Sequence, residues 1–226
     1  MLVVDGRARK SYGSVAMSAS RRMSGATVRP VQQEIDSFVL DVLPAQGGWR
    51  EDEYLWLSDH SSQLIELTDG HLELLPMPTD EHQSILAFLY ELFAAFVHGR
   101  GGKVLFAPLR LRIADGTFRE PDLLLVRDAA DARRGNRFWT GADVVVEVVS
   151  PDQPERDVVD KRRDYAGAGI PEYWIVDPRT AEVTVLTYRD GAYIEHGTFA
   201  RGAQVESPLL PGLTVAVHSL FNAANV

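Results

Sequence analysis

The chain has 226 residues with 45% hydrophobic content, enough for one domain with a buried core, and it has no cysteine for disulfides or thiolate metal sites. Its formal net charge of −9 argues against a strong nonspecific DNA binder, which needs a broad basic surface. No apolar run approaches the ~20 residues that cross a bilayer, and MLVVDGRARK lacks the order of a secretory signal, so we expect a cytoplasmic protein without a membrane partner.

The first part of the chain is expected to stand apart from the rest. Residues 1–30 are rich in Ser, Gly and Arg and lack periodicity, which predicts a mobile N-terminal tail. Helical spacing of apolar residues begins at Val31, and a second short helix is expected around Arg50 to Leu57. Residues 31–60 are therefore predicted to form a helical segment, followed by the main domain over residues 61–226.

The main domain begins with a hairpin and a helix. In SQLIELTDGHLELLPMP, Asp69-Gly70 is the turn signal between two short strands. From Asp80 the apolar residues follow helical spacing to about His98, where glycines end the helix.

Further strands alternate with one helix. KVLFAPLRLRI predicts one or two strands, and EPDLLLVRD predicts another that begins near Asp122. DARRGNRFWTG is expected to be a polar loop. It is followed by a buried strand, ADVVVEVVSP, and by a helix, PERDVVDKRRDYAGAG. EYWIVD, EVTVLTY and AYIEHGTF follow as strands, with a short one near Leu213 to Val217. This order predicts an α/β or α+β fold, a mixed central β-sheet flanked by helices. The apolar strands near the C-terminus are compatible with a homodimer.

One carboxylate lies inside a run of valines. Glu147 has five β-branched neighbours in VVVEVVSP, a pattern typical of a buried strand. A buried charge without a partner is strongly unfavourable, so Glu147 needs a cation, hydrogen-bond donors or a metal. Asp122 begins the preceding apolar strand, and two carboxylates on adjacent strands can hold a hard divalent cation such as Mg²⁺.

Lys161 is the candidate cation beside these acids. The chain has only three lysines, Lys10, Lys103 and Lys161, among its 23 basic residues. Because arginine supplies almost all of the positive charge, a position that carries lysine is more often one where lysine itself is needed. Helical spacing places Asp157, Lys161 and Tyr165 in one row. A metal nuclease often has a lysine two residues after its second acid, but that position is Val149 here, so the helix would have to supply the ammonium.

The chain resembles the Uma-two family of restriction-endonuclease-like proteins, a branch of the PD-(D/E)XK nuclease superfamily. The resemblance covers roughly residues 50 to 221. It rests on IELTDGHLELLPMP, EHQSI, EPD at 120–122, VVEVVSP at 145–151 and RDVVDKRRDYAGAGIPEYWIVDP at 156–178. It implies a restriction-endonuclease-like core in which Asp122, Glu147 and the carbonyl of Val148 bind the metal and Lys161 replaces the usual lysine.

Five more residues are candidate accessory groups. His82 matches a family histidine, with metal or water contact as one alternative and a helix-start hydrogen bond as the other. Glu66 and Glu73, in the hairpin, could each reach the metal. Asp157 is expected to be a partner of Lys161, and Tyr165 to pack or to contact phosphate.

These features predict a Mg²⁺-dependent endonuclease, a hydrolase that cleaves phosphodiester bonds of nucleic acid, with DNA the expected substrate. Mn²⁺ could substitute, because the expected ligands are all oxygen. The alternative is a catalytically silent protein that keeps the nuclease fold as a binding module, and a third is a nuclease that acts only with a partner protein. Fold analogy alone does not decide between them.

Overall fold

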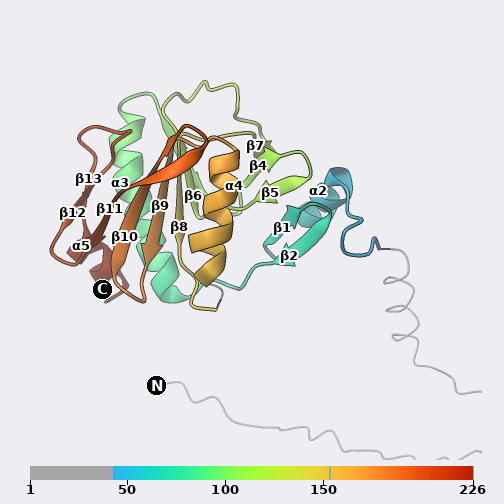
Figure 1. Ribbon diagram of the computed structural model, residues 1–226, viewed down its shortest axis with the longest axis horizontal. Coiled ribbons are helices and arrows are strands. Elements are labelled where there is room, and N and C mark those ends of the chain that lie inside the picture. Colours follow the sequence, from blue (N-terminus) through green and yellow to red (C-terminus); the bar gives the residue numbers. More distant parts are fainter. Residues whose placement is uncertain (1–42, 153, 226) are drawn as a thin grey trace, which may run out of the picture. The chain divides into compact units, whose positions relative to one another are not determined.

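The computed structural model describes residues 43–152 and 154–225, and Pro44–Val226 form one compact unit. The tail predicted over residues 1–30 and the helix predicted from Val31 lie outside the described residues. The confirmed fold class is α+β, with mixed sheets and flanking helices (Figure 1). Within the described ranges, no helix is both long and apolar enough to span a bilayer.

The main sheet contains six strands. In spatial order they are β11 (Ala192–Ala200), β10 (Glu182–Arg189), β9 (Glu172–Asp177), β8 (Val144–Val148), β6 (Leu123–Val126) and β3 (Lys103–Phe106). The pair β8–β9 is parallel and the other pairs are antiparallel. All five residues of β8 are buried, which explains why its sequence, apart from Glu147, is apolar on both faces rather than alternating.

A second sheet has five strands. In spatial order they are β2 (His71–Leu74), β1 (Ile65–Thr68), β5 (Thr117–Arg119), β4 (Arg110–Ala114) and β7 (Phe138–Trp139). The hairpin β1–β2 turns at Asp69-Gly70 as predicted, with both residues at positive φ. Helix α2 (Glu51–His60) packs on this sheet, where the Tyr54 ring lies 5.0 Å from that of Phe118.

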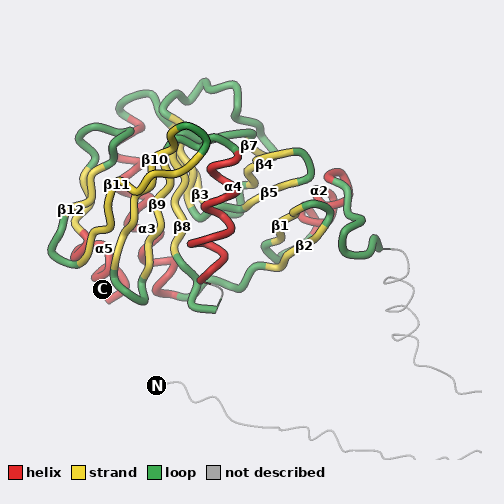
Figure 2. The backbone as a smooth tube through the Cα atoms, viewed as in Figure 1, coloured by secondary structure: helices red, strands yellow, loops and turns green. Residues whose placement is uncertain are grey.

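Two helices cover opposite faces of the main sheet (Figures 1 and 2). The apolar side of α3 (Asp80–His98) packs with Val144, Val146 and Val148, the residues of β8 that point to one face. Helix α4 (Lys161–Gly167) packs with Val145 and Val149 on the other face. Glu147 therefore points to the side of the sheet that α4 covers.

The sequence predictions were wrong in several places. The expected polar loop at 131–141 contains the short strand β7, and β5 was not predicted. A third sheet pairs β13 (Thr214–Ala216), the short strand predicted near Leu213 to Val217, with β12 (Gln204–Glu206), which was not predicted. Helix α5 (Val217–Asn222) and a 3₁₀ turn (Ala223–Asn225), which follow, were not predicted either. The helix predicted from 154 does begin there, but a π-helical turn, Arg156–Asp160, precedes α4.

Candidate metal-dependent active site

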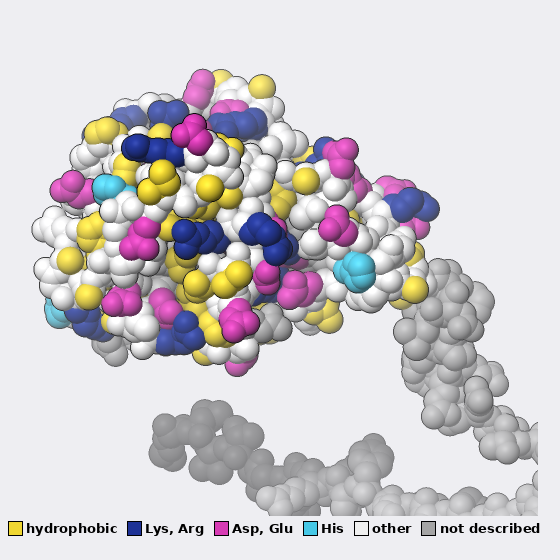
Figure 3. All heavy atoms as spheres, viewed as in Figure 1, with side chains coloured by type: hydrophobic (Ala, Val, Ile, Leu, Met, Phe, Trp, Pro, Cys, Tyr) yellow, Lys and Arg dark blue, Asp and Glu magenta, His cyan; other side chains and the backbone are white. Residues whose placement is uncertain are grey.

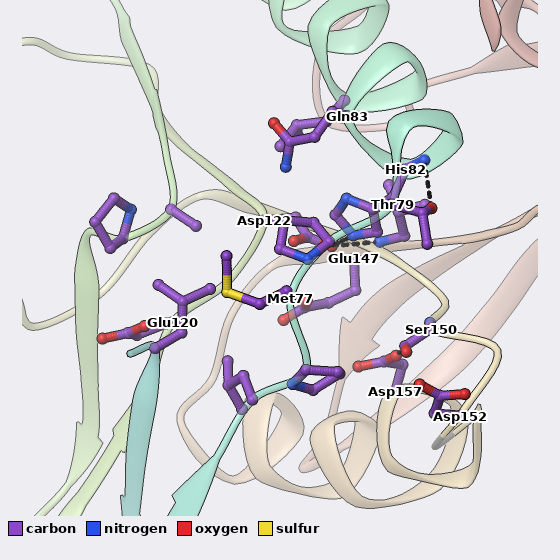
Figure 4. A pocket seen from close by; sticks show the side chains of 18 of the residues that line it. Met77, Thr79, His82, Gln83, Glu120, Asp122, Glu147, Ser150, Asp152 and Asp157 are labelled. Carbon is purple, nitrogen blue, oxygen red and sulfur yellow. Dashed lines mark hydrogen bonds and ion pairs between the residues drawn. The ribbon is translucent and has the colours of Figure 1, made fainter. Parts of the chain in front are cut away.

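A cleft of about 340 Å³ lies where the main sheet meets the five-stranded sheet. Its lining includes residues before β1 and after β2, the start of α3, the end of β3, the connection from β5 to β6, the end of β8, the π-helical turn and the start of α4. The lining includes Asp122, Glu147, Val148, Asp157 and Lys161. Residues far apart in the sequence therefore meet in one place (Figure 4).

Asp122 enters the cleft because it immediately precedes β6. Leu123 pairs with Val146 in the antiparallel ladder, so the next position places Asp122 opposite Glu147. Residues opposite each other in such a ladder have Cβ atoms about 4.5–5.5 Å apart. The two carboxylates predicted from the sequence therefore share one face of adjacent strands.

Two donors hold the Asp122 carboxylate. Its Oδ2 accepts a hydrogen bond from the Val148 amide at 2.7 Å and lies 3.1 Å from His82 Nε2 (Figure 4). His82 is positioned from the N-terminus of α3, where its amide donates to the Thr79 hydroxyl at 3.2 Å. Burial alone would lower the pKa of His82. The hydrogen bond and the charge of Asp122, together with the charges of Glu147 and Asp157, raise that pKa above its ordinary value.

Glu147 is buried and held from α4. Tyr165 donates its hydroxyl to Oε1 at 2.5 Å, and the Lys161 ammonium lies 2.7 Å from Oε2. Burial raises the pKa of Glu147, and the carboxylates of Asp122 and Asp157 add to this while Lys161 opposes it. The partners required for a charge inside β8 therefore come from the helix that follows it.

Lys161 is shared between two carboxylates. Besides Glu147, its ammonium contacts Asp157 Oδ1 at 2.9 Å. Burial alone would lower the pKa of Lys161, but Glu147 and Asp157 raise it, so the side chain stays cationic. The Asp157 carboxylate also accepts from the Ser150 amide at 3.3 Å, which ties the π-helical turn to the end of β8. With Asp122 beside this pair, three carboxylates lie near a single lysine, which leaves excess negative charge for a cation.

The structure does not bring Glu66 or Glu73 into the cleft. Glu66 is fully buried and is bound by Arg119 at 2.8 Å, by Arg156, and by the Glu120 amide at 2.9 Å. Its cross-strand neighbour Glu73 lies 3.6 Å from Arg156 and lines an adjoining hollow. Both therefore belong to an arginine network beside the cleft.

Glu120 also lines the cleft and was not among the predicted site residues, although it begins the EPD motif. Burial, together with the charge of Glu66, raises the pKa of Glu120 to about 8 while Arg110 opposes this. Its Oε1 lies 4.0 Å from Arg110 Nε, and its buried Oε2 has no hydrogen-bond partner among the described residues. Arg156 was also missed, although it lies within the quoted RDVVDK block.

A comparison with solved structures found a protein with the same fold. A chain from Anabaena variabilis ATCC 29413, described as "a putative nuclease belonging to DUF820", matches with a TM-score of 0.65 and 21% sequence identity. The match covers 80% of the present chain and 99% of that chain.

The chain belongs to the Uma2 family, whose description is "Putative restriction endonuclease". The family profile matches residues 51–218, well over half of the sequence, and confirms the predicted family. A search of the curated proteins found no match.

Proposed function

We propose that the cleft hydrolyses phosphodiester bonds of nucleic acid with Mg²⁺ or Mn²⁺, and that DNA is its substrate. The observation that carries this proposal is the convergence of Asp122, Glu147 and Lys161, from two adjacent strands and one helix, on one cleft. Family membership and the nuclease-like fold support the reaction class.

The residues present fit a hard divalent cation. Asp122, Glu147 and the Val148 carbonyl offer only oxygen, and the three nearby carboxylates exceed the one lysine in charge. In the described part of the chain, no three His, Asp or Glu side chains form a metal site by themselves. Two carboxylates suit Mg²⁺, which usually keeps several waters and completes its shell with substrate phosphate.

When bound, the cation would lower the pKa of a water and neutralise charge on the phosphate. The chain's own residues supply orientation. His82 and the Val148 amide fix Asp122, while Tyr165 and Lys161 fix Glu147. Lys161 also provides a permanent positive charge at the floor of the cleft for the negative charge that develops at phosphorus.

A binding module without catalysis is the second candidate. It is favoured by the closed network around Glu147, in which Tyr165 and Lys161 each already occupy one carboxylate oxygen. Each carboxylate oxygen has a further lone pair, so the network does not prevent metal binding. Calorimetry with Mg²⁺ and Mn²⁺ separates the two candidates, because a silent module has no need to retain the ion.

The test is cleavage of supercoiled plasmid and single-stranded DNA by the purified chain with either metal. We expect Asp122→Asn and Glu147→Gln to lower the rate by about a hundredfold or more, because each removes a metal carboxylate. Asp115→Asn is the matched control, since this carboxylate is exposed in the turn between β4 and β5. Cleavage that persists in Glu147→Gln would contradict the proposal.

A further inference from the structure

The cleft is lined by two chemically different groups of residues. One group is the carboxylate set around Asp122 and Glu147. The other is apolar and comes from the β2–α3 connection, the end of β3 and the β3–β4 connection: Leu75, Pro76, Met77, Pro78, Phe106 and Pro108. An enzyme that bound only the sugar–phosphate backbone would have little use for this apolar lining.

Met77 and Phe106, here called the apolar rim, are exposed despite their size. Met77 is 71% exposed and Phe106 is 48% exposed. The Phe106 ring is held by Tyr90 of α3 in an edge-to-face contact, with centroids 5.0 Å apart. Figure 4 shows Met77 between Glu120 and Glu147 at the cleft. The apolar rim thus offers apolar surface directly beside the carboxylates.

The cations of the cleft lining are already paired. Arg156 is bound to Glu66, and Lys161 lies within 2.9 Å of both Glu147 and Asp157. On the face shown in Figure 3, Lys and Arg side chains are scattered among acidic and apolar ones and form no continuous basic area. Phosphate contacts with unpaired Lys or Arg, the usual source of affinity for nucleic acid, are therefore scarce at this cleft.

We propose that the apolar rim is a stacking subsite for an unpaired nucleobase, so that the substrate strand is single-stranded where it enters the cleft. This inference rests on the proposed function for the identity of the neighbouring phosphate. Every base offers a flat face to an aromatic or apolar side chain, which makes such binding independent of sequence. In a duplex both faces are covered by neighbouring bases, and exposing one requires unpairing.

Binding is measured without hydrolysis, using the full chain and a short oligothymidylate that carries one 2-aminopurine, without divalent metal and then with Ca²⁺. We expect quenching of the fluorescent base and an affinity at least about tenfold higher for the single strand than for its duplex. Met77→Ala and Phe106→Ala should each weaken single-strand binding by roughly tenfold. Leu74→Ala is the matched control, because Leu74 ends β2 just before the connection that carries Met77 and is 62% exposed but does not line the cleft.

Salt gives a second readout. For single strands, the logarithm of the binding constant falls with the logarithm of salt concentration by about 0.7 for each phosphate neutralised. Because the cleft's cations are already paired, we expect a slope of about −1 or shallower. A steep slope would assign the affinity to backbone phosphates instead of bases and would overturn the proposal.

The outcomes separate this inference from the proposed function. Equal binding of single strand and duplex, no detectable single-strand binding, or unchanged binding by Met77→Ala and Phe106→Ala would overturn the stacking subsite. If those variants lose binding while the wild-type chain cleaves nothing with Mg²⁺ or Mn²⁺, the subsite stands and the nuclease proposal fails. If duplex is cleaved at equal rates by wild type and Met77→Ala, the nuclease proposal stands and the subsite fails.

Discussion

Glu66 shows how a single buried carboxylate can stabilise this fold. Burial alone would raise the pKa of Glu66, but Lys161, Arg156 and Arg119, with the Glu120 amide, lower it to about 2. The ionised form is therefore favoured in the folded protein. Breaking such a set by removing one partner leaves uncompensated buried charges, which is more damaging than losing an exposed ion pair.

We expect Glu66→Gln to lower the free energy of unfolding near pH 7 by about 3 kcal/mol. A pKa lowered in the folded state adds stability that is present above the ordinary value of 4.5 and is lost as pH falls toward about 2. The difference between wild type and Glu66→Gln should therefore shrink as pH falls from 5 to 3. Urea unfolding followed by circular dichroism at several pH values measures it.

Glu73→Gln is the control for this prediction. Glu73 is paired in register with Glu66 and approaches the same Arg156, but its side chain is 43% exposed. Exposed ion pairs contribute between zero and about 1 kcal/mol, so the substitution should have a small effect that varies little with pH. A pH-independent difference for Glu66→Gln as well would rule out ionisation of Glu66 as the cause.

The sequence was most informative where a residue broke a local pattern. Glu147 stood out within a valine strand, and Lys161 stood out as a rare lysine, and the structure brings both together with Asp122. The partners of Glu66 gave no such signal, because Arg119 and Arg156 lie 53 and 90 residues away along the chain. Their ion pairs depend on how the two sheets meet, which no spacing rule describes.

At the scale of elements, the hairpin β1–β2 depends on its turn. Gly70 has a φ of +75°, and a Cβ built there would lie 2.7 Å from the Gly47 carbonyl oxygen. That oxygen belongs to a segment that the hairpin holds, since the Gly47 and Trp49 amides both donate to the Gly70 carbonyl. The glycine thus serves both the turn and the approach of a neighbouring segment.

Gly70→Ala should therefore destabilise the protein more than Gly116→Ala. Both positions have φ near +70°, but a Cβ at Gly116 would meet no atom within 4 Å. Gly116→Ala is expected to cost about 1 kcal/mol from its backbone conformation alone, and Gly70→Ala roughly 2–3 kcal/mol because the contact with Gly47 adds to this. Thermal and urea unfolding of the two variants compare these effects directly, and equal losses would show that the contact has no effect.

Elements with strong local signals were the predictable ones. The Asp-Gly turn, the amphipathic α3 and the apolar β8 follow from turn chemistry and periodicity. The missed elements β5, β7 and β12 have only two or three residues each, too few for a periodic pattern to develop. The π-helical turn was also unpredictable, because the chain stays helical there and only the hydrogen-bond spacing changes. The Lys161 amide donates to the carbonyl of Arg156, five residues earlier, instead of four residues earlier as in an α-helix.

At the scale of the whole molecule, the net charge of −9 bears on both proposals. Acidic charge repels the nucleic-acid backbone, so affinity has to come from contacts that do not depend on a basic surface. A divalent cation in the cleft would reduce this repulsion at the place where phosphate must approach. The proposed metal binding and the proposed base stacking are therefore both compatible with the acidic composition.

We expect a metal bound in the cleft to stabilise the entire fold. A ligand that binds only the folded state adds about 2.7 kcal/mol at a hundred times its dissociation constant, equivalent to a rise in Tm of roughly 5–10 °C at this chain length. Differential scanning calorimetry with Mn²⁺ should show this rise for wild type and Asp115→Asn, and Asp122→Asn should lack it. An equal rise in Asp122→Asn would place the ion elsewhere. The stabilisation depends on the affinity of the folded state for the metal, so removing a metal ligand must reduce it.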